Sequence, residues 1–285
     1  MCQLLGMNAN VPTDICFSFS GFRQRGGLTD HHADGWGIGF FEDAGCRLFI
    51  DTEASVTSPI AALVSAYPIR SRQVIAHIRK ATQGQTLLQN THPFQRELGG
   101  RYWLFAHNGD LKGFVPKPGA VRPVGDTDSE MAFCHLLNQI LLSCPDGRPS
   151  DEQLLSVVTR VAGEIARHGT FNFLLSNGDW LLAHCSTLLT WIVREAPFSV
   201  AHLSDDDVSV DFREHTGPDD RVAVIATAPL TDNEVWTPVA PGTLLMFRDG
   251  ALQASISTSL TVSVDTPLNS HHAAHAGAAA ESQAT

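Results

Sequence analysis

The order of strand-like and helix-like segments limits the possible folds of this 285-residue chain more than any other feature. Two stretches in the middle, Asp128 to Leu142 and Asp151 to His168, carry apolar residues at helical spacing. Strand-like runs precede and follow this pair instead of alternating with single helices. Because parallel sheets are built from alternating strand and helix units, the order predicts an α+β fold with two antiparallel sheets and helices packed outside them.

Short apolar or aromatic runs mark the strands. Trp36 to Phe41 and Cys46 to Ile50 flank an Asp-Ala-Gly turn and predict a β-hairpin. After this hairpin, Ser58 to Tyr67 has helical spacing and opens with Ser-Pro, which is a helix start signal. Further strands are predicted at residues 73–77, 102–107, 171–176, 180–184, 190–194, 221–226 and 243–248.

The composition suits one large globular domain. Hydrophobic residues make up 43% of the chain and charged residues 17%, which is enough apolar surface for a sizeable core. We expect this domain to span residues 1–265. Residues 266–285 lack bulky apolar groups after Leu268, so we expect a disordered tail there. Its histidines, His271, His272 and His275, could bind a metal weakly, but a solvated tail is the favoured interpretation.

Charge and cysteine usage exclude several classes of partner. The net charge is -11 and no basic cluster is present, which argues against binding to nucleic acid or to an anionic membrane. No apolar stretch approaches the roughly 20 residues of a membrane span, and no signal peptide is evident, so we expect a cytoplasmic protein. The six cysteines lack CxxC spacing and suggest neither a thiolate metal site nor a disulfide scaffold.

Cys2 is distinguished by its position directly behind the initiator methionine. Removal of Met1 would leave a terminal cysteine, which carries a thiol nucleophile and an α-amino group whose pKa is ordinarily about 8. Nucleophile and base would then belong to one residue. A cysteine at position 2 is a weak signal in isolation.

Two strand ends carry polar groups that could serve such a nucleophile. In AHIRKATQG, Arg79 follows an apolar strand and could grip a carboxylate with two hydrogen bonds, although a surface arginine is the alternative. In FAHNGDL, Asn108 and Gly109 follow a second apolar strand. Their amide and backbone N–H could form an oxyanion hole, and the alternative is a simple turn.

The segment GDTDSE precedes the first of the two central helices. One of its carboxylates, Asp126 or Asp128, could hold a substrate ammonium group. Either residue could instead be the N-cap of the helix, which is the commoner role of an isolated aspartate in this position.

Taken together and in this order, six segments resemble the class II glutamine amidotransferases of the N-terminal-nucleophile hydrolase superfamily: MCQLLGMN, HHADGWGIGF, AHIRKATQG, THPFQ, FAHNGDL and GDTDSE. The resemblance covers nearly the whole chain and looks strongest to the stand-alone branch of predicted amidotransferases. That branch includes amidohydrolases of ergothioneine biosynthesis and of glutathione breakdown. The resemblance implies a four-layer αββα sandwich.

The resemblance also implies a role for each residue of the site. Cys2 would be the nucleophile with its own α-amine as base, and Asn108 and Gly109 would form the oxyanion hole. Substrate binding would fall to Arg79 for the α-carboxylate of glutamine, to Asp128 for the α-ammonium group, and to Thr82 in the segment after Arg79.

The chain departs from the synthase-linked members of that family at two positions of the glutamine pocket. Those members commonly have tryptophan after the arginine and histidine after the Ala-Thr pair, where this chain has Lys80 and Gln83. Nothing after about residue 265 could house a synthase domain, so we expect no built-in ammonia acceptor.

A metal or nucleotide cofactor is not expected. Five histidines and an aspartate in the first 110 residues could suggest a zinc hydrolase, but none of the histidines has HxxxH spacing. His31, His32 and Asp34 more plausibly shape the loop beside the nucleophile, as the matching loop does in the resembled family. No phosphate-binding GxxxxGK[ST] or GxGxxG motif is present. The histidines are His31, His32, His77, His92 and His107.

The sequence therefore favours an amidohydrolase that cleaves the side-chain amide of glutamine, or of a γ-glutamyl compound, through a cysteine thioester. Two alternatives remain open. The chain could be a glutaminase subunit that feeds ammonia to a partner protein, or a non-catalytic scaffold that keeps the fold and retains Met1.

Overall fold

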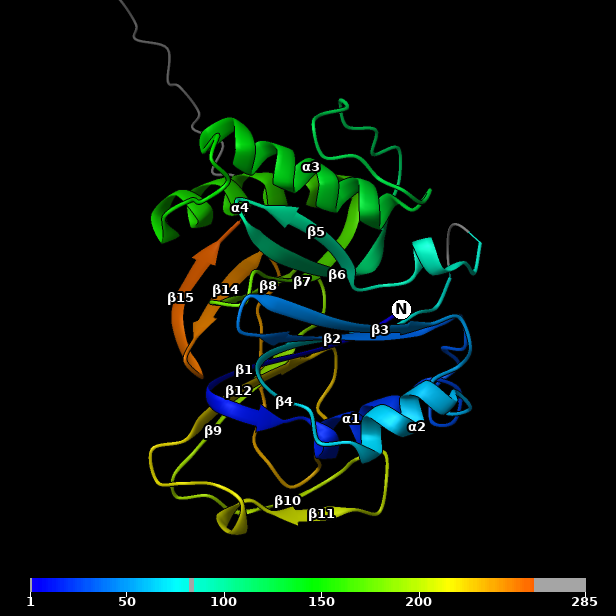
Figure 1. Ribbon diagram of the computed structural model, residues 1–285, viewed down its shortest axis with the longest axis vertical. Coiled ribbons are helices and arrows are strands. Elements are labelled where there is room, and N and C mark those ends of the chain that lie inside the picture. The colour runs from blue at the N-terminus through cyan, green and yellow to red at the C-terminus, as the bar shows by residue number, and fades with distance from the viewer. Residues whose placement is uncertain (1, 82–84, 259–285) are drawn as a thin grey trace, which may run out of the picture.

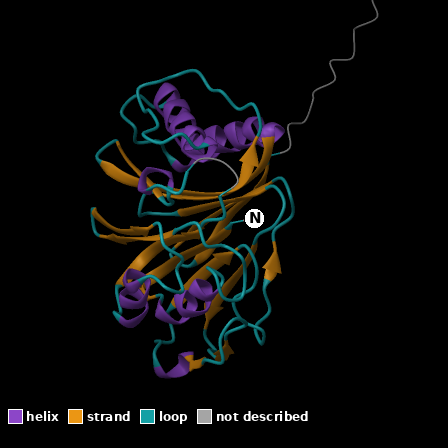
Figure 2. Cartoon of the chain, turned by 90° about the vertical axis from the view of Figure 1, so that its right-hand side faces the viewer, coloured by secondary structure: helices purple, strands orange, loops and turns teal. Residues whose placement is uncertain are grey.

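Two antiparallel sheets stacked face to face form the centre of the molecule, and two helices cover the outer face of each (Figure 1). The computed structural model describes residues 2–81 and 85–258. A view turned by 90° shows the four layers in sequence, with helices, strands, strands and helices (Figure 2). The α+β class and the αββα layering predicted from the sequence are confirmed.

The seven-stranded sheet has the order β13-β9-β12-β1-β4-β2-β3. Helices α1 (Cys16–Gln24) and α2 (Pro59–Ala66) lie on its outer face (Figure 1). Its strands are β1 (Gln3–Asp14), β2 (Trp36–Glu42), β3 (Gly45–Asp51), β4 (Arg70–Ile78), β9 (Thr190–Glu195), β12 (Arg221–Ala226) and β13 (Thr237–Pro238).

The six-stranded sheet has the order β15-β14-β8-β7-β6-β5 and is covered by α3 (Asp128–Ser143) and α4 (Asp151–Ile165). Its strands are β5 (Phe94–Leu98), β6 (Arg101–Leu111), β7 (Gly169–Ser176), β8 (Leu181–Cys185), β14 (Thr243–Arg248) and β15 (Ala251–Ser257). The remaining elements are the pair β10 (Val200–His202) and β11 (Ser209–Asp211) and the 3₁₀ turns η1 (Leu88–Asn90), η2 (Ala166–His168) and η3 (Phe212–Glu214).

Three apolar layers separate the four layers of secondary structure. Leu4 of β1 packs between the sheets with Leu104 of β6 and their neighbours. Phe105 of the second sheet stacks on Phe133 of α3 with ring centroids 5.0 Å apart. A third cluster, which includes Phe19 and Trp36, fills the space under α1 and α2. Each sheet is therefore buried on both faces, which fixes the two sheets relative to each other.

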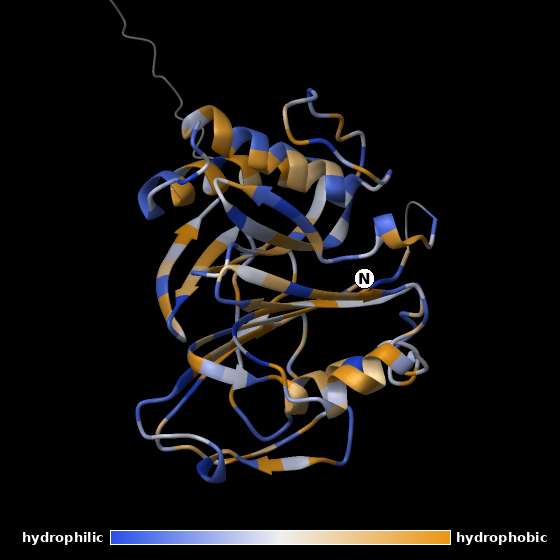
Figure 3. Ribbon diagram, viewed as in Figure 1, coloured by the Kyte–Doolittle hydropathy of each residue, from blue (hydrophilic) through white to orange (hydrophobic). Residues whose placement is uncertain are grey.

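The helix starts follow the signals in the sequence. Ser58 caps α2 by accepting a hydrogen bond from the Ala61 N–H at 3.2 Å, directly before the proline. Ser150 and Gln153 form a reciprocal capping box at the start of α4. Helix α2 is apolar over most of its length (Figure 3). Within residues 2–81 and 85–258, no helix is long and apolar enough to cross a membrane.

Several elements have no clear signal in the sequence, and strand β1 is the most central of them. Strand β1 lies in the middle of its sheet although it contains Asn8, Asn10 and Pro12. Asn8 is tolerated because its side chain is fully engaged: its Nδ2 donates to Gln73 Oε1 and its Oδ1 accepts from the Gly250 N–H, both at 2.8 Å. Strands β5, β10, β11, β13 and β15 and helix α1 were likewise not predicted. The proposed tail at 266–285, with its histidines, lies outside the described residues.

Candidate active site

The start of β1 places Cys2 beside the end of β4. Gln3 pairs with Ile78 in antiparallel register, so Cys2 lies next to Arg79 and Lys80. The Lys80 N–H donates to the Cys2 Sγ at 3.2 Å, and the thiol lies 3.4 Å from the Lys80 carbonyl oxygen. Burial raises the pKa of the Cys2 thiol above its usual value, an effect that the hydrogen bond from Lys80 partly offsets. The thiol is therefore protonated at neutral pH and needs a base before it can attack.

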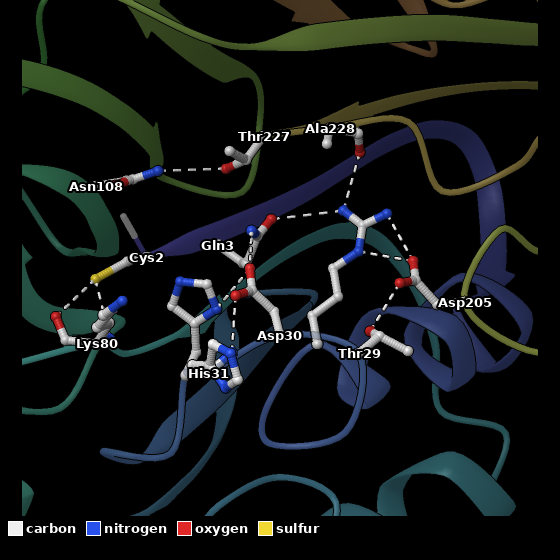
Figure 4. Close-up of polar contacts among 12 residues, drawn as sticks. Cys2, Gln3, Thr29, Asp30, His31, Lys80, Asn108, Asp205, Thr227 and Ala228 are labelled. Atoms are coloured by element: carbon white, nitrogen blue, oxygen red, sulfur yellow. Dashed lines mark hydrogen bonds and ion pairs between the residues drawn. The ribbon is translucent and has the colours of Figure 1, made fainter.

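A polar network holds the neighbourhood of the nucleophile in place (Figure 4). Gln3 lies within hydrogen-bonding reach of Asp30 and of the guanidinium of Arg25, at 3.4 and 3.5 Å. Arg25 also donates to Asp205 at 2.7 Å and to the carbonyl oxygen of Ala228 at 3.1 Å. The first residue of β1 is thereby tied to segments far along the chain.

Arg79 is buried, so the alternative of a surface arginine is wrong. Its backbone N–H donates to the Gly35 carbonyl oxygen at 2.8 Å, and its own carbonyl oxygen accepts from Asp34. The Asp34 carboxylate in turn accepts from the Ala81 N–H at 2.8 Å. One guanidinium nitrogen donates to the Gln85 carbonyl oxygen at 3.2 Å. The loop around Asp34 thus fixes the backbone that carries the arginine.

Asn108 and Gly109 lie inside β6 and not in a turn after it. Asn108 pairs with Asn172 and Gly109 with Phe171 of β7, so the turn interpretation is wrong. The Asn108 side chain is fully buried, and its Nδ2 reaches the Thr227 Oγ1 at 3.5 Å. A Cβ atom on Gly109 would lie 1.8 Å from the Thr170 carbonyl oxygen, so this position accepts only glycine.

Asp128 is the first residue of α3 but does not cap it. Thr127 is the N-cap and accepts from the Glu130 N–H at 3.2 Å, so the alternative that Asp126 or Asp128 caps the helix is wrong. Asp128 is instead buried beside β6 and accepts from the Leu111 N–H at 2.7 Å. Asp126 accepts from the Asn90 side chain at 2.8 Å.

One pocket brings most of these residues together. Cys2, Arg79, Gly109 and Asp128 all line it, although they come from four separate segments of the chain. Asn108 precedes Gly109 on the same strand. The rest of the lining is Lys80, Ala81, His92, His107, Thr127 and Ser129. Thr82, which was predicted to bind substrate, lies outside the described residues.

Three buried histidines at this pocket contact one another. His77 and His92 have ring centroids 4.2 Å apart, and the His77 Nε2 lies 3.1 Å from the His107 carbonyl oxygen. His107 contacts Ser129 Oγ at 2.8 Å and the Thr170 carbonyl oxygen at 3.0 Å. Burial lowers the pKa of His77 to about 3 and that of His92 well below its usual value. These imidazoles are neutral at physiological pH.

The other two histidines lie on the loop before β2. The His32 Nδ1 is 2.9 Å from the Asp30 carboxylate, and the His31 backbone N–H donates to the same side chain at 2.7 Å. Among residues 2–81 and 85–258, no three His, Cys, Asp or Glu side chains gather in a way that could hold a metal ion. All six cysteines fall in the described residues, and each is free.

His92 was not singled out from the sequence as a site residue. His92 was considered only as one of the five histidines of the zinc-hydrolase alternative, and its segment THPFQ was part of the resemblance. Its position on the pocket wall depends on its contact with His77, which no local pattern reveals.

Comparison with known proteins adds the family context. The model of the family "Glutamine amidotransferases class-II" matches residues 1–270. YafJ of Escherichia coli (strain K12), named as a candidate glutamine amidotransferase, is 53% identical over 248 residues, which are 87% of this chain and 97% of YafJ. A gamma-glutamyl-hercynylcysteine sulfoxide hydrolase of Mycolicibacterium smegmatis is 28% identical over 234 residues, covering 81% of this chain and 84% of that protein.

Solved structures agree in fold. The crystal structure of a predicted glutamine amidotransferase from Pseudomonas aeruginosa PA01 matches with a TM-score of 0.72 and 49% identity, covering 89% of this chain and 100% of that one. Glutamine phosphoribosylpyrophosphate amidotransferase from B. subtilis matches with a TM-score of 0.55 at 15% identity, covering 91% of this chain and 50% of that one. The second likeness concerns the fold alone.

Proposed function

Because the chain belongs to the class II glutamine amidotransferase family, we propose that it is a cysteine-dependent amidohydrolase that cleaves the side-chain amide of glutamine or of a γ-glutamyl compound. The observation that carries this proposal is the pocket in which the Cys2 thiol lies with Arg79, Gly109 and Asp128. The pocket combines a nucleophile with a cation and an anion, which are the charges needed to hold an amino-acid head group.

The nucleophile needs a base, since burial keeps its thiol protonated. Removal of Met1 would supply one, because the α-amine of Cys2 would then be free. In the proposed first step the α-amine takes the thiol proton and the sulfur bonds to the γ-carbonyl carbon. The α-amine next passes the proton to the leaving nitrogen as the C–N bond breaks, which leaves a γ-glutamyl thioester. Water then attacks the thioester carbonyl, and the thiol regains a proton when glutamate leaves.

The developing oxyanion would be held by the Asn108 Nδ2 and the Gly109 N–H. The Asn108 Nδ2 makes only a long contact of 3.5 Å to Thr227, so it can form a shorter bond to an oxyanion at little cost. Gly109 is rigid within a strand pair, so its backbone needs no rearrangement. Both donors would be fixed before the substrate arrives.

The head group of the substrate would lie between Arg79 and Asp128, the guanidinium facing the α-carboxylate and the carboxylate facing the α-ammonium. Asp128 is held ready by its hydrogen bond from Leu111. Thr82 is proposed to contribute to the same binding site. No metal or cofactor enters this chemistry. Water is the proposed acyl acceptor, and the relative from Mycolicibacterium smegmatis, named as a gamma-glutamyl-hercynylcysteine sulfoxide hydrolase, supports that choice. A cytoplasmic location, where thiols stay reduced, suits the mechanism.

The decisive experiment compares the mature protein with its Cys2→Ala variant on glutamine and a panel of γ-glutamyl amides. We expect loss of a mass equal to one methionine by intact-mass measurement, and no turnover by the variant. Retained Met1, or equal activity of both proteins, would contradict the proposal and favour the scaffold alternative. Glutaminase activity that rises only with a co-purifying protein would identify an ammonia-accepting partner instead.

A further inference from the structure

His92 occupies an unusual position for a buried histidine. It is only 4% exposed, follows η1 in the chain, and lines the pocket that contains Cys2. Its ring packs between two other aromatic rings, at 4.2 Å from His77 and 4.3 Å from Phe94 between centroids. A phenylalanine would fill such a packing role as well as an imidazole does.

Both ring nitrogens of His92 are buried without a hydrogen-bond partner. This sets His92 apart from His107, whose two nitrogens contact Ser129 and Thr170. An unsatisfied buried polar group costs about 1–3 kcal/mol, and native structures contain few of them. A polar ring that lacks partners and lines a small-molecule pocket indicates that the partner is the ligand.

The surroundings identify which part of the ligand His92 meets. Arg79 lines the same pocket, and its positive charge contributes to lowering the pKa of His92, after burial and the neighbouring histidines. A neutral imidazole offers one N–H donor and one acceptor. The Arg79 guanidinium attracts an anion, so the imidazole N–H of His92 is the group that finds an acceptor there. A carboxylate can accept hydrogen bonds from both the guanidinium and the imidazole N–H, because its two oxygens have room for about four hydrogen bonds.

We propose that His92 donates a hydrogen bond to the α-carboxylate of the γ-glutamyl substrate, beside Arg79. The assignment rests on the proposed function, in that it names a second recognition group in the same site. His92 is thus a specificity residue for the amino-acid head group, together with Arg79 and Asp128, while Cys2 and Gly109 act on the amide.

The test uses His92→Phe, which keeps an aromatic ring between His77 and Phe94 but removes both nitrogens. Three anilides separate the charges of the head group: L-γ-glutamyl p-nitroanilide, glutaryl p-nitroanilide without the ammonium, and 4-aminobutanoyl p-nitroanilide without the carboxylate. We expect kcat/KM of the variant to fall about 10- to 100-fold on the two substrates that carry the carboxylate, because one hydrogen bond to a charged group is lost. On the 4-aminobutanoyl substrate, which lacks the carboxylate, kcat/KM should not change.

Stability provides an independent measure in the same variant. If the nitrogens serve the ligand, the Tm of ligand-free His92→Phe should equal or exceed that of the wild type, because two unsatisfied groups have been removed. A lowered Tm with equal loss on all three anilides would overturn the proposal and make His92 structural. Unchanged kinetics, or a loss that spares the glutaryl substrate instead, would also overturn it.

Failure of the proposed function is recognised separately. If the wild-type protein hydrolyses none of the three anilides, the hydrolase proposal fails, but the proposed role of His92 in binding can still be tested. Calorimetry then measures the binding of L-glutamate, glutarate and 4-aminobutanoate. The wild type should bind the first two more tightly than His92→Phe does, by the same 10- to 100-fold, and the third equally. Equal affinities for L-glutamate, or no binding by either protein, would overturn the role of His92.

Discussion

Replacing Gly109 with alanine should damage both the stability and the proposed chemistry, because the backbone leaves no room for a Cβ atom. That atom would lie 1.8 Å from the Thr170 carbonyl oxygen, whereas real Cβ atoms essentially never come closer than 3.0 Å to a neighbour. Strands β6 and β7 would have to separate locally by at least the difference, 1.2 Å. No rotamer change relieves the clash, because the obstructing atom belongs to the backbone.

The size of both effects follows from this displacement. Forcing an extra group into a packed site costs typically about 1–3 kcal/mol, and a rigid strand pair belongs at the upper end. For a domain of this length, about 3 kcal/mol lowers the Tm by roughly 6–12 °C. A shift of about 1 Å in a catalytic group costs on the order of 100-fold in rate. We therefore expect a folded protein that has lost most of its kcat.

The assay measures the Tm by thermal unfolding and kcat on L-γ-glutamyl p-nitroanilide at a temperature where both proteins are folded. Gly217→Ala is the matched control, because a Cβ there would lie 3.5 Å from Asp220, an ordinary contact. A wild-type Tm and undiminished kcat in Gly109→Ala would refute the steric reasoning. A lowered Tm with normal kcat would remove Gly109 from the oxyanion hole.

Two further predictions concern buried charge. The pKa of His77 is about 3 in the fold against 6.5 ordinarily, so the unfolded chain takes up the proton first as the pH falls. Stability is therefore lost below pH 6.5, and His77 alone should lower the free energy of unfolding by about 2 kcal/mol at pH 5. Urea denaturation at pH 6.5 and at pH 5 should show a smaller loss of stability in His77→Gln than in the wild type. An equal loss in both proteins would contradict this prediction. The Glu234→Ala substitution removes the carboxylate that lies 2.6 Å from Arg194 and leaves a buried arginine unpaired, because both side chains are under 10% exposed. It should lower the free energy of unfolding by about 3 kcal/mol. Glu42→Ala, which breaks an exposed pair, should cost less than about 1 kcal/mol in the same measurement.

The elements that are regular in sequence were the ones that could be predicted. The hairpin β2–β3, the helices α2, α3 and α4 and most long strands carry strong periodicity or caps, and the structure confirms them. Strand β1 could not be predicted from its local sequence. Its buried Asn8 is tolerated because the side chain forms hydrogen bonds to partners 65 and 242 residues away. Such partners exist only once the chain is folded.

The site shows the same division between local and distant information. The sequence order indicated which residues to consider, and the pocket brings Cys2, Arg79, Gly109 and Asp128 together. Their local settings were harder to foresee. Asn-Gly is typical of a turn, yet its pairing with β7 makes it part of a strand. An arginine at the end of a strand is typically exposed, yet Arg79 is buried in the fold. The roles of these residues stay predictions.

The candidate site is divided between the two sheets. Cys2 and Arg79 belong to the seven-stranded sheet, whereas Asn108 and Gly109 belong to the six-stranded sheet and Asp128 to a helix packed on it. The two halves are aligned by the apolar layer between the sheets, which includes Leu4 and Leu104, and by polar contacts such as the one between His77 and the His107 carbonyl oxygen. The proposed activity should therefore be sensitive to the alignment of the two sheets. A slide of one sheet over the other by a fraction of a side chain should abolish this activity while every helix and strand remains intact.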